Sequence, residues 1–138
     1  MRRNRPDQLR LLERELTGEI IGAFYLCYSN LGFGFLESVY RRALAAELRY
    51  RNLVVVEEAP LEVVYRGVPV GRFRLDMLVA ERVAVELKST LVLGPTDQRQ
   101  LINYLRASEL KVGLLLHFGP QPKFHRVVSP KVLAAQVD

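Results

Sequence analysis

The segment from Arg72 to Ser89 constrains the fold more than any other part of this 138-residue chain. In it, apolar residues alternate with other residues on both sides of a short break at Ala80–Glu81. Because successive strand residues point to opposite faces, this pattern predicts an antiparallel hairpin with one apolar face. A register centred on Glu81 pairs Val79 with Val83, Met77 with Val85, and Leu75 with Leu87. A slip of one residue would break all three apolar pairs.

The same register places Asp76 directly opposite Glu86, with Lys88 one step along on the same face. Facing carboxylates have Cβ atoms only ~5 Å apart and repel each other. One explanation is a surface charge cluster in which Lys88 and Arg74 neutralise the pair. The other is a divalent cation held between the carboxylates, because hard oxygen ligands suit Mg²⁺ or Mn²⁺. The residues of the hairpin alone leave both explanations open.

Two helices are expected before this hairpin. Apolar residues recur at three- and four-residue steps from Leu9 to Phe24, although Thr17 and Gly18 interrupt the pattern and leave one helix or two undecided. Residues 29–34 contain two glycines and an asparagine, which predicts a turn. A second helix is expected over about residues 35–49. Glu37 and Tyr40 project from one side of it.

The rest of the chain predicts a mixed sheet and a third helix. Short runs rich in Val, Leu and aromatics at residues 54–56, 61–65, 68–79 and 82–87 suggest an antiparallel meander. A helix over about 97–108 and a strand over 112–118 follow, and residues 121–138 suggest a short strand or arm and a helical turn. In the third helix Gln100 and Tyr104 share a side, while Leu101 and Leu105 face inward. This order predicts one α/β domain over residues 1–138.

Composition narrows the class of protein. The net charge of +5 and the sequence pI near 9.7 favour an anionic partner. A single cysteine, Cys27, forms no internal disulfide, and no apolar run approaches the ~20 residues of a membrane span, so a cytoplasmic protein is expected. The chain has no phosphate-binding GxxxxGKS or GxGxxG loop. His117 and His125 are too far apart, and lack a cysteine partner, for a zinc site.

Several blocks, taken in order, resemble the GxxExxY proteins. Residues 34–40, GFLESVY, match the signature for which that family is named. The blocks ALAAEL, VVYRGVPVGRFRLDMLV, VAVELKS, QLINYL and LKVGLLLHFG follow in the family's order, and the likeness spans about residues 16–128. The family resembles a small branch of the PD-(D/E)XK nuclease superfamily, which implies a restriction-endonuclease-like core of helix, three strands, helix and strand around a mixed sheet.

The resemblance also implies roles for individual residues. Asp76 and Glu86 correspond to the two acids that coordinate Mg²⁺ or Mn²⁺, and Lys88 corresponds to the lysine that orients the attacking water or helps to deprotonate it. The backbone carbonyl of Leu87 and the acid Glu37 correspond to further metal ligands, and Gln100 to the glutamine that supports the site. Tyr40, Arg74 and Tyr104 are expected at the rim of the site or in contact with nucleic acid.

Three departures from the family pattern stand out. Asp97 takes the place of a histidine found in many relatives, and His117 the place of an asparagine. Ser89 and Thr90 follow Lys88, where a small apolar residue is usual. None of these changes removes an expected metal ligand.

Together these features predict a metal-dependent phosphodiester hydrolase, most simply a DNA nuclease. We expect low sequence specificity, or recognition supplied by a homodimer or by a partner protein. The alternative is a catalytically inactive module of the same fold that binds nucleic acid or another protein.

Overall fold

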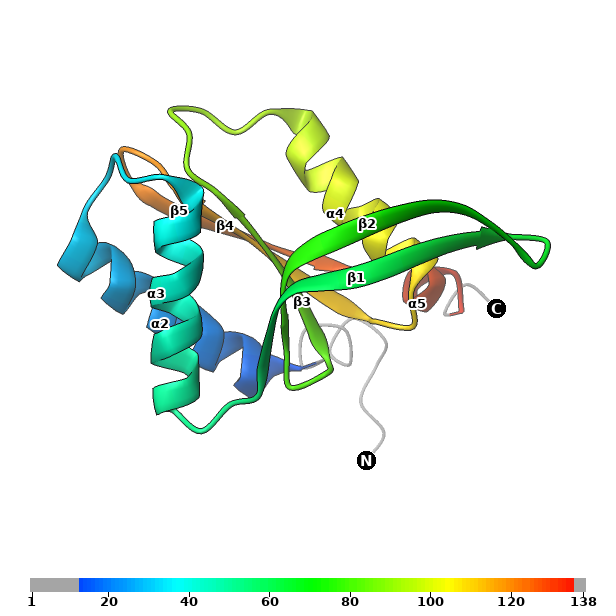
Figure 1. Ribbon diagram of the computed structural model, residues 1–138, viewed down its shortest axis with the longest axis horizontal. Coiled ribbons are helices and arrows are strands. Elements are labelled where there is room, and N and C mark those ends of the chain that lie inside the picture. The colour runs from blue at the N-terminus through cyan, green and yellow to red at the C-terminus, as the bar shows by residue number, and fades with distance from the viewer. Residues whose placement is uncertain (1–12, 136–138) are drawn as a thin grey trace.

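The computed structural model describes residues 13–135, and Leu9 and Leu12 of the first expected helix lie outside that range. The elements in chain order are α2 (Arg14–Leu31), α3 (Glu37–Tyr50), β1 (Val55–Tyr65), β2 (Val68–Val79), β3 (Val83–Lys88), α4 (Pro95–Ala107), β4 (Val112–Phe118), β5 (Pro122–Val128) and α5 (Pro130–Ala134) (Figure 1). The fold is α/β with a mixed sheet, as predicted from the sequence.

The five strands form one sheet in the order β1-β2-β3-β4-β5. Neighbouring strands are antiparallel except for β3 and β4, which are parallel because α4 carries the chain across between them. The two expected runs at 54–56 and 61–65 form the single strand β1, which passes through Pro60. A proline fits there because β1 is an edge strand of the sheet.

The core lies on both faces of the sheet. On one face α2 and α3 pack against alternate residues of the central strands, including Val85 and Leu116. On the other face α4 packs through Leu101 and Leu105, as the spacing predicted, against Ala84 and its neighbours. In Figure 1, α2 and α3 lie to one side, and α4 runs down from above β2 and passes behind the nearer part of β1 and β2. The two faces therefore bring α3 and α4 to opposite sides of β3.

The first helix is continuous across the interruption at Thr17 and Gly18. Thr17 is accommodated because its hydroxyl donates to the backbone carbonyls of Glu13 and Arg14. The helix also runs to Leu31, so residues 29–31, which were expected in a turn, form its last turn instead.

The hairpin register is confirmed where β2 and β3 pair. Val79 pairs with Val83 and Met77 with Val85. The ladder ends there, so the expected contact of Leu75 with Leu87 is wrong. Leu87 packs on the α2–α3 face and Leu75 on the α4 face.

A distortion of β1 explains this change of face. Glu58 has φ of 51°, in the left-handed region, and lies between the residues that pair with Met77 and Leu75. Beyond this point β1 and β2 pair only with each other and run out over α4 as a two-stranded ribbon (Figure 1). We call residues 59–75 the hairpin arm.

Candidate active site

Asp76 and Glu86 lie side by side where β2 leaves β3. The backbone N–H of Asp76 donates to Glu86 Oε1 at 2.9 Å, and the backbone N–H of Leu87 donates to Asp76 Oδ2 at 2.8 Å. Each carboxylate thus accepts a main-chain hydrogen bond from the other strand. These two bonds hold the strands together after the regular ladder has ended, and they fix the orientation of both acids.

The surroundings of Glu86 disfavour its charge. The residue is 5% exposed, among the four buried polar or charged residues of the described chain. Burial, and then the negative charge of Asp76, raise the pKa of Glu86 from 4.5 to about 8. The nearby Lys88 acts in the opposite direction. Without a bound cation, the pair therefore retains a proton near neutral pH.

Lys88 lies at the end of β3, on the same face as Glu86. Its Nζ is 3.8 Å from Asp97 Oδ1, and both side chains are largely buried. The other oxygen of Asp97 accepts the backbone N–H of Gly94 at 2.9 Å. Asp97 therefore anchors the lysine while it also caps the first turn of α4. The sequence marked Asp97 as a departure from the family pattern, but did not reveal that it contacts Lys88.

Glu37, in the first turn of α3, approaches the pair from the other side of β3. Burial and the charge of Asp76 raise its pKa, whereas Lys88 and Arg41 lower it. Its carboxylate therefore lies close enough to Asp76 and Lys88 for their charges to shift its pKa. Within residues 13–135, however, no group of three or more His, Cys, Asp and Glu side chains is arranged to hold a metal ion. A ligand role for Glu37 stays a prediction.

Gln100 and Tyr104 reach the site from α4. The Gln100 side chain lies close to the Tyr104 hydroxyl and acts to lower the pKa of the tyrosine. Burial and the charges of Glu86 and Asp76 raise it more, so the net shift is upward. Tyr104 thus lies at the edge of the carboxylate pair, beside Gln100, where the sequence placed both residues.

Tyr40 is not at the rim of the site, contrary to the expectation from its spacing. Its side chain is fully buried, its ring stacks on Phe118 at 4.1 Å, and its hydroxyl donates to the carbonyl of Gly32. The hydroxyl also accepts the backbone N–H of Phe35. Tyr40 instead supports the loop that leads into α3. The helical spacing from Glu37 was right, but it could not show that the sheet covers the tyrosine.

Arg74 does not neutralise the carboxylates. Its side chain is exposed on the hairpin arm, and it forms no salt bridge within residues 13–135. Lys88, and not Arg74, is the cation whose charge reaches Glu86. Of the two explanations for the facing acids, a surface cluster of Lys88 with Arg74 does not form.

The comparisons with known proteins decide the family. The sequence profile described as "PD-(D/E)XK nuclease superfamily" matches residues 14–127. The chain belongs to the PD-(D/E)XK nuclease superfamily. In this PD-(D/E)XK protein the matched region runs from the start of α2 to the last residue but one of β5. It contains all of the residues of the candidate site.

A solved structure described as "Crystal structure of SSO0001" is similar to this PD-(D/E)XK protein, with a TM-score of 0.53 and 18% identity. The match covers 96% of this chain and 69% of that one, and at this identity it supports the fold alone. The comparison with curated proteins gave no match. None of the helices between residues 13 and 135 is long and apolar enough to cross a bilayer.

Proposed function

We propose that this PD-(D/E)XK protein is a metal-dependent phosphodiester hydrolase that cleaves DNA, with Asp76 and Glu86 as the ligands of Mg²⁺ or Mn²⁺. The observation that carries the proposal is the pair of acids held side by side by reciprocal main-chain hydrogen bonds, with Lys88 next to them. An arrangement that raises the pKa of Glu86 is unfavourable for a purely structural pair, and a cation would offset the repulsion.

The donor set fits such a cation. Mg²⁺ keeps several waters and takes one or two carboxylates together with substrate phosphates, so it needs no three-carboxylate cluster. Each acid has one oxygen on a main-chain N–H, which orients the carboxylate and leaves its second oxygen available. We propose Glu37 and the Leu87 carbonyl as further ligands. When bound, the cation would neutralise the phosphate and lower the pKa of its water.

The other residues of the site supply charge and position. Lys88 places an ammonium next to the acids, where it would stabilise the negative charge that gathers on the phosphate oxygens during attack. Asp97 limits the freedom of that ammonium through the 3.8 Å ion pair. Gln100 and Tyr104, which lie next to each other, form the wall of the site on α4.

We also propose that the chain belongs to the GxxExxY branch of the superfamily. In support, the signature residues 34–40 form the loop and first turn that direct Glu37 toward Asp76 and Lys88. The signature tyrosine, Tyr40, holds this loop through its two main-chain hydrogen bonds.

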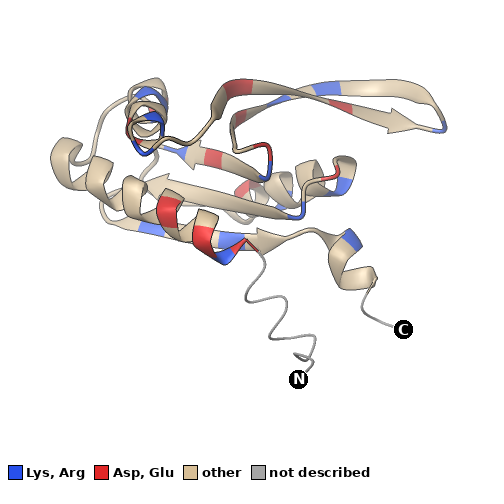
Figure 2. Ribbon diagram, turned by 90° about the horizontal axis from the view of Figure 1, so that it is seen from below, with Lys and Arg blue, Asp and Glu red and all other residues tan. Residues whose placement is uncertain are grey.

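DNA is the proposed substrate because the chain is basic and the chemistry of the site suits a phosphodiester. Lys and Arg are spread over helices and strands among acidic residues (Figure 2). This distribution favours contacts to the DNA backbone, which carry little sequence information. A homodimer or a partner protein would then have to supply any sequence recognition.

Cleavage of labelled single- and double-stranded DNA, with and without Mn²⁺, tests the proposal. We expect metal-dependent cleavage by the native protein, and its loss in Lys88→Ala and Glu86→Gln. Lys111→Ala and Glu109→Gln change exposed residues of the same types away from the site and should cleave normally. Cleavage by both site variants at the native rate would exclude the assignment.

Titration calorimetry with Mn²⁺ separates the nuclease from its alternative. Binding that is lost in Glu86→Gln supports the metal site independently of any DNA substrate. If the native protein binds neither Mn²⁺ nor Mg²⁺, the chain is instead an inactive module with the same fold.

A further inference from the structure

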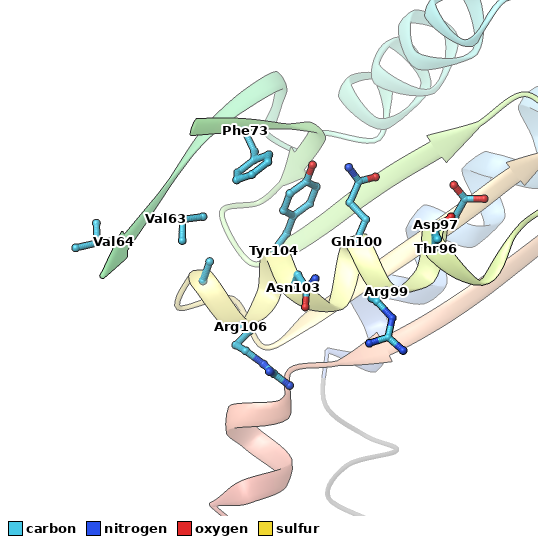
Figure 3. A pocket seen from close by; sticks show the side chains of 11 residues that line it. Val63, Val64, Phe73, Thr96, Asp97, Arg99, Gln100, Asn103, Tyr104 and Arg106 are labelled. Atoms are coloured by element: carbon cyan, nitrogen blue, oxygen red, sulfur yellow. The ribbon is translucent and has the colours of Figure 1, made fainter. Parts of the chain in front are cut away.

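A large cavity opens beside the candidate active site, between the hairpin arm and α4. Its volume is about 780 Å³, within the range of small-molecule sites. Asp97, Gln100 and Tyr104 line it from α4, and Val63 and Phe73 line it from the arm (Figure 3). The cavity and the site therefore share residues, and whatever occupies the first lies next to the second.

The walls of the cavity are aromatic and apolar at the side facing the arm. The Phe73 ring is 44% exposed, and its centroid lies 5.4 Å from that of Tyr104. In Figure 3 the Phe73 ring comes from the arm and the Tyr104 ring from α4, with their planes tilted by 48°, and Val63 lies further along the arm. An exposed ring backed by a second ring offers a flat surface on which another planar ring can stack.

Cationic side chains lie along the same helix. Arg99 and Arg106 line the cavity, are exposed, and extend from α4 away from the two rings (Figure 3). Neither forms a salt bridge or a hydrogen bond with another part of the described chain. The Asn103 side chain, between them on α4, adds an amide that can donate and accept. A flat apolar surface with free guanidinium groups nearby suits a nucleotide.

We propose that this cavity holds an unpaired base, and that the preferred substrate of the active site is single-stranded DNA. The inference rests on the proposed nuclease function and names its substrate class. Bases in a duplex are already stacked and paired, so they present no free ring face to Phe73, whereas an unpaired base can leave the strand and stack there. The phosphates of the same strand would follow Arg99 and Arg106, and the strand would continue toward Asp76 and Glu86.

Binding measured without any divalent cation tests the inference, because no cleavage then occurs. The probes are a single-stranded oligonucleotide carrying one 2-aminopurine and a duplex of the same sequence. We expect quenching of the 2-aminopurine fluorescence on binding, and affinity for the single strand at least about tenfold above that for the duplex. Equal affinity for the two probes would overturn the inference.

Variants of Phe73 test whether its ring is responsible for the binding of single-stranded DNA. Phe73→Leu keeps apolar volume but removes the stacking surface, and should weaken single-strand binding about tenfold and abolish quenching. Phe73→Tyr should keep both. The matched control is Phe124→Leu, a 38% exposed ring on β5 that also has a tyrosine neighbour but lies outside the cavity. If the two leucine variants bind alike, the cavity is not the binding site.

Failure of the base-binding proposal can be distinguished from failure of the nuclease proposal. Base-dependent binding by Phe73 without Mn²⁺-dependent cleavage would support the cavity and exclude the nuclease. Conversely, Mn²⁺-dependent cleavage of duplex that is indifferent to Phe73→Leu would support the nuclease and exclude the cavity as a base site.

Discussion

Asp76 and Glu86 are joined by an exchange of hydrogen bonds in which each carboxylate accepts a main-chain N–H from the other's strand. The side chains thus take over the role of the ladder at the place where β2 turns away from β3. This position also keeps Glu86 out of water, which disfavours its charge. Structure and chemistry are therefore coupled at one point, because the acids that would bind a cation also hold the end of the sheet.

This coupling predicts a pH-dependent stability in the metal-free protein. The folded-state pKa of Glu86 is about 8, above its ordinary 4.5, so the folded state keeps a proton that the unfolded state has lost. Stability should therefore fall as the pH rises through this window, by at most about 1.4 kcal/mol per pH unit from this group. Thermal unfolding in EDTA should show the fall in the native protein and a smaller one in Glu86→Gln. Parallel curves for the two proteins would contradict the buried, raised pKa.

The same proton should leave when a cation binds. Below about pH 8 the pair holds a proton that competes with the metal, so binding near neutral pH should release about one proton per cation. Calorimetry in two buffers that differ in ionisation enthalpy measures this number. The release should shrink at a pH well above 8. A binding enthalpy that is the same in both buffers would show that the cation binds elsewhere or that Glu86 is already ionised.

Much of this site could be predicted from the sequence, because alternation fixes which residues share a face of a strand. The facing of Asp76 and Glu86 followed from the pairs Met77–Val85 and Val79–Val83, which the structure contains. The loss of the expected contact between Leu75 and Leu87 could not be predicted, since the backbone distortion at Glu58 has no signal in the pattern of apolar residues.

Tertiary contacts are the second reason why the sequence could not predict the whole site. Helical spacing placed Gln100 and Tyr104 on one side of α4, and burial of Leu101 and Leu105 turns that side toward the site. Helical spacing failed to locate Tyr40, because its ring stacks on Phe118 of β4. These two residues are far apart in the chain, so the spacing within one helix cannot reveal the contact. Periodicity gives the faces of an element, but the packing of other elements decides which face is exposed.

Tyr40 should therefore act mainly on stability, because its buried side chain does not touch the substrate. Tyr40→Phe removes a hydroxyl that bonds the Gly32 carbonyl and the Phe35 N–H, and should lower the free energy of unfolding by about 1 kcal/mol. Tyr28→Phe, which removes a hydroxyl bonded to the Gly119 carbonyl at 2.6 Å, is the matched control and should cost a similar amount. Tyr28→Phe should keep metal-dependent cleavage per folded molecule, and Tyr40→Phe should lower it only modestly, through the loop that directs Glu37. A complete loss of cleavage in Tyr40→Phe would return this residue to the site.

Lys88 should not be replaceable by arginine. The ammonium is compact and lies in a largely buried position between the acids and Asp97, whereas a guanidinium is planar and broader. Lys88→Arg keeps the positive charge, so it should retain the fold, yet we expect metal-dependent cleavage to fall by about tenfold or more. Lys111→Arg, at an exposed position, is the control and should leave the rate unchanged. Native activity in Lys88→Arg would mean that charge alone, and not the shape of the ammonium, is required.

Because α4 packs closely on the sheet at Gly113, a substitution there should shift α4 and the site residues that it carries. A Cβ added to Gly113 would lie 3.0–3.2 Å from three atoms of the Leu101 side chain, which is fully buried between α4 and β4. Because the core leaves little room to yield, Gly113→Ala should destabilise the protein by about 1–3 kcal/mol. It should also displace α4 and reduce cleavage, since Gln100 and Tyr104 lie on that helix.

The control is Gly18→Ala, in α2, where no atom lies within 4 Å of the added carbon. This variant should stabilise the protein by about 0.5–1 kcal/mol and leave cleavage unchanged. Denaturant unfolding together with single-turnover cleavage measures both effects, and equal stability of the two variants would show that α4 does not pack as closely on β4 as the distances require.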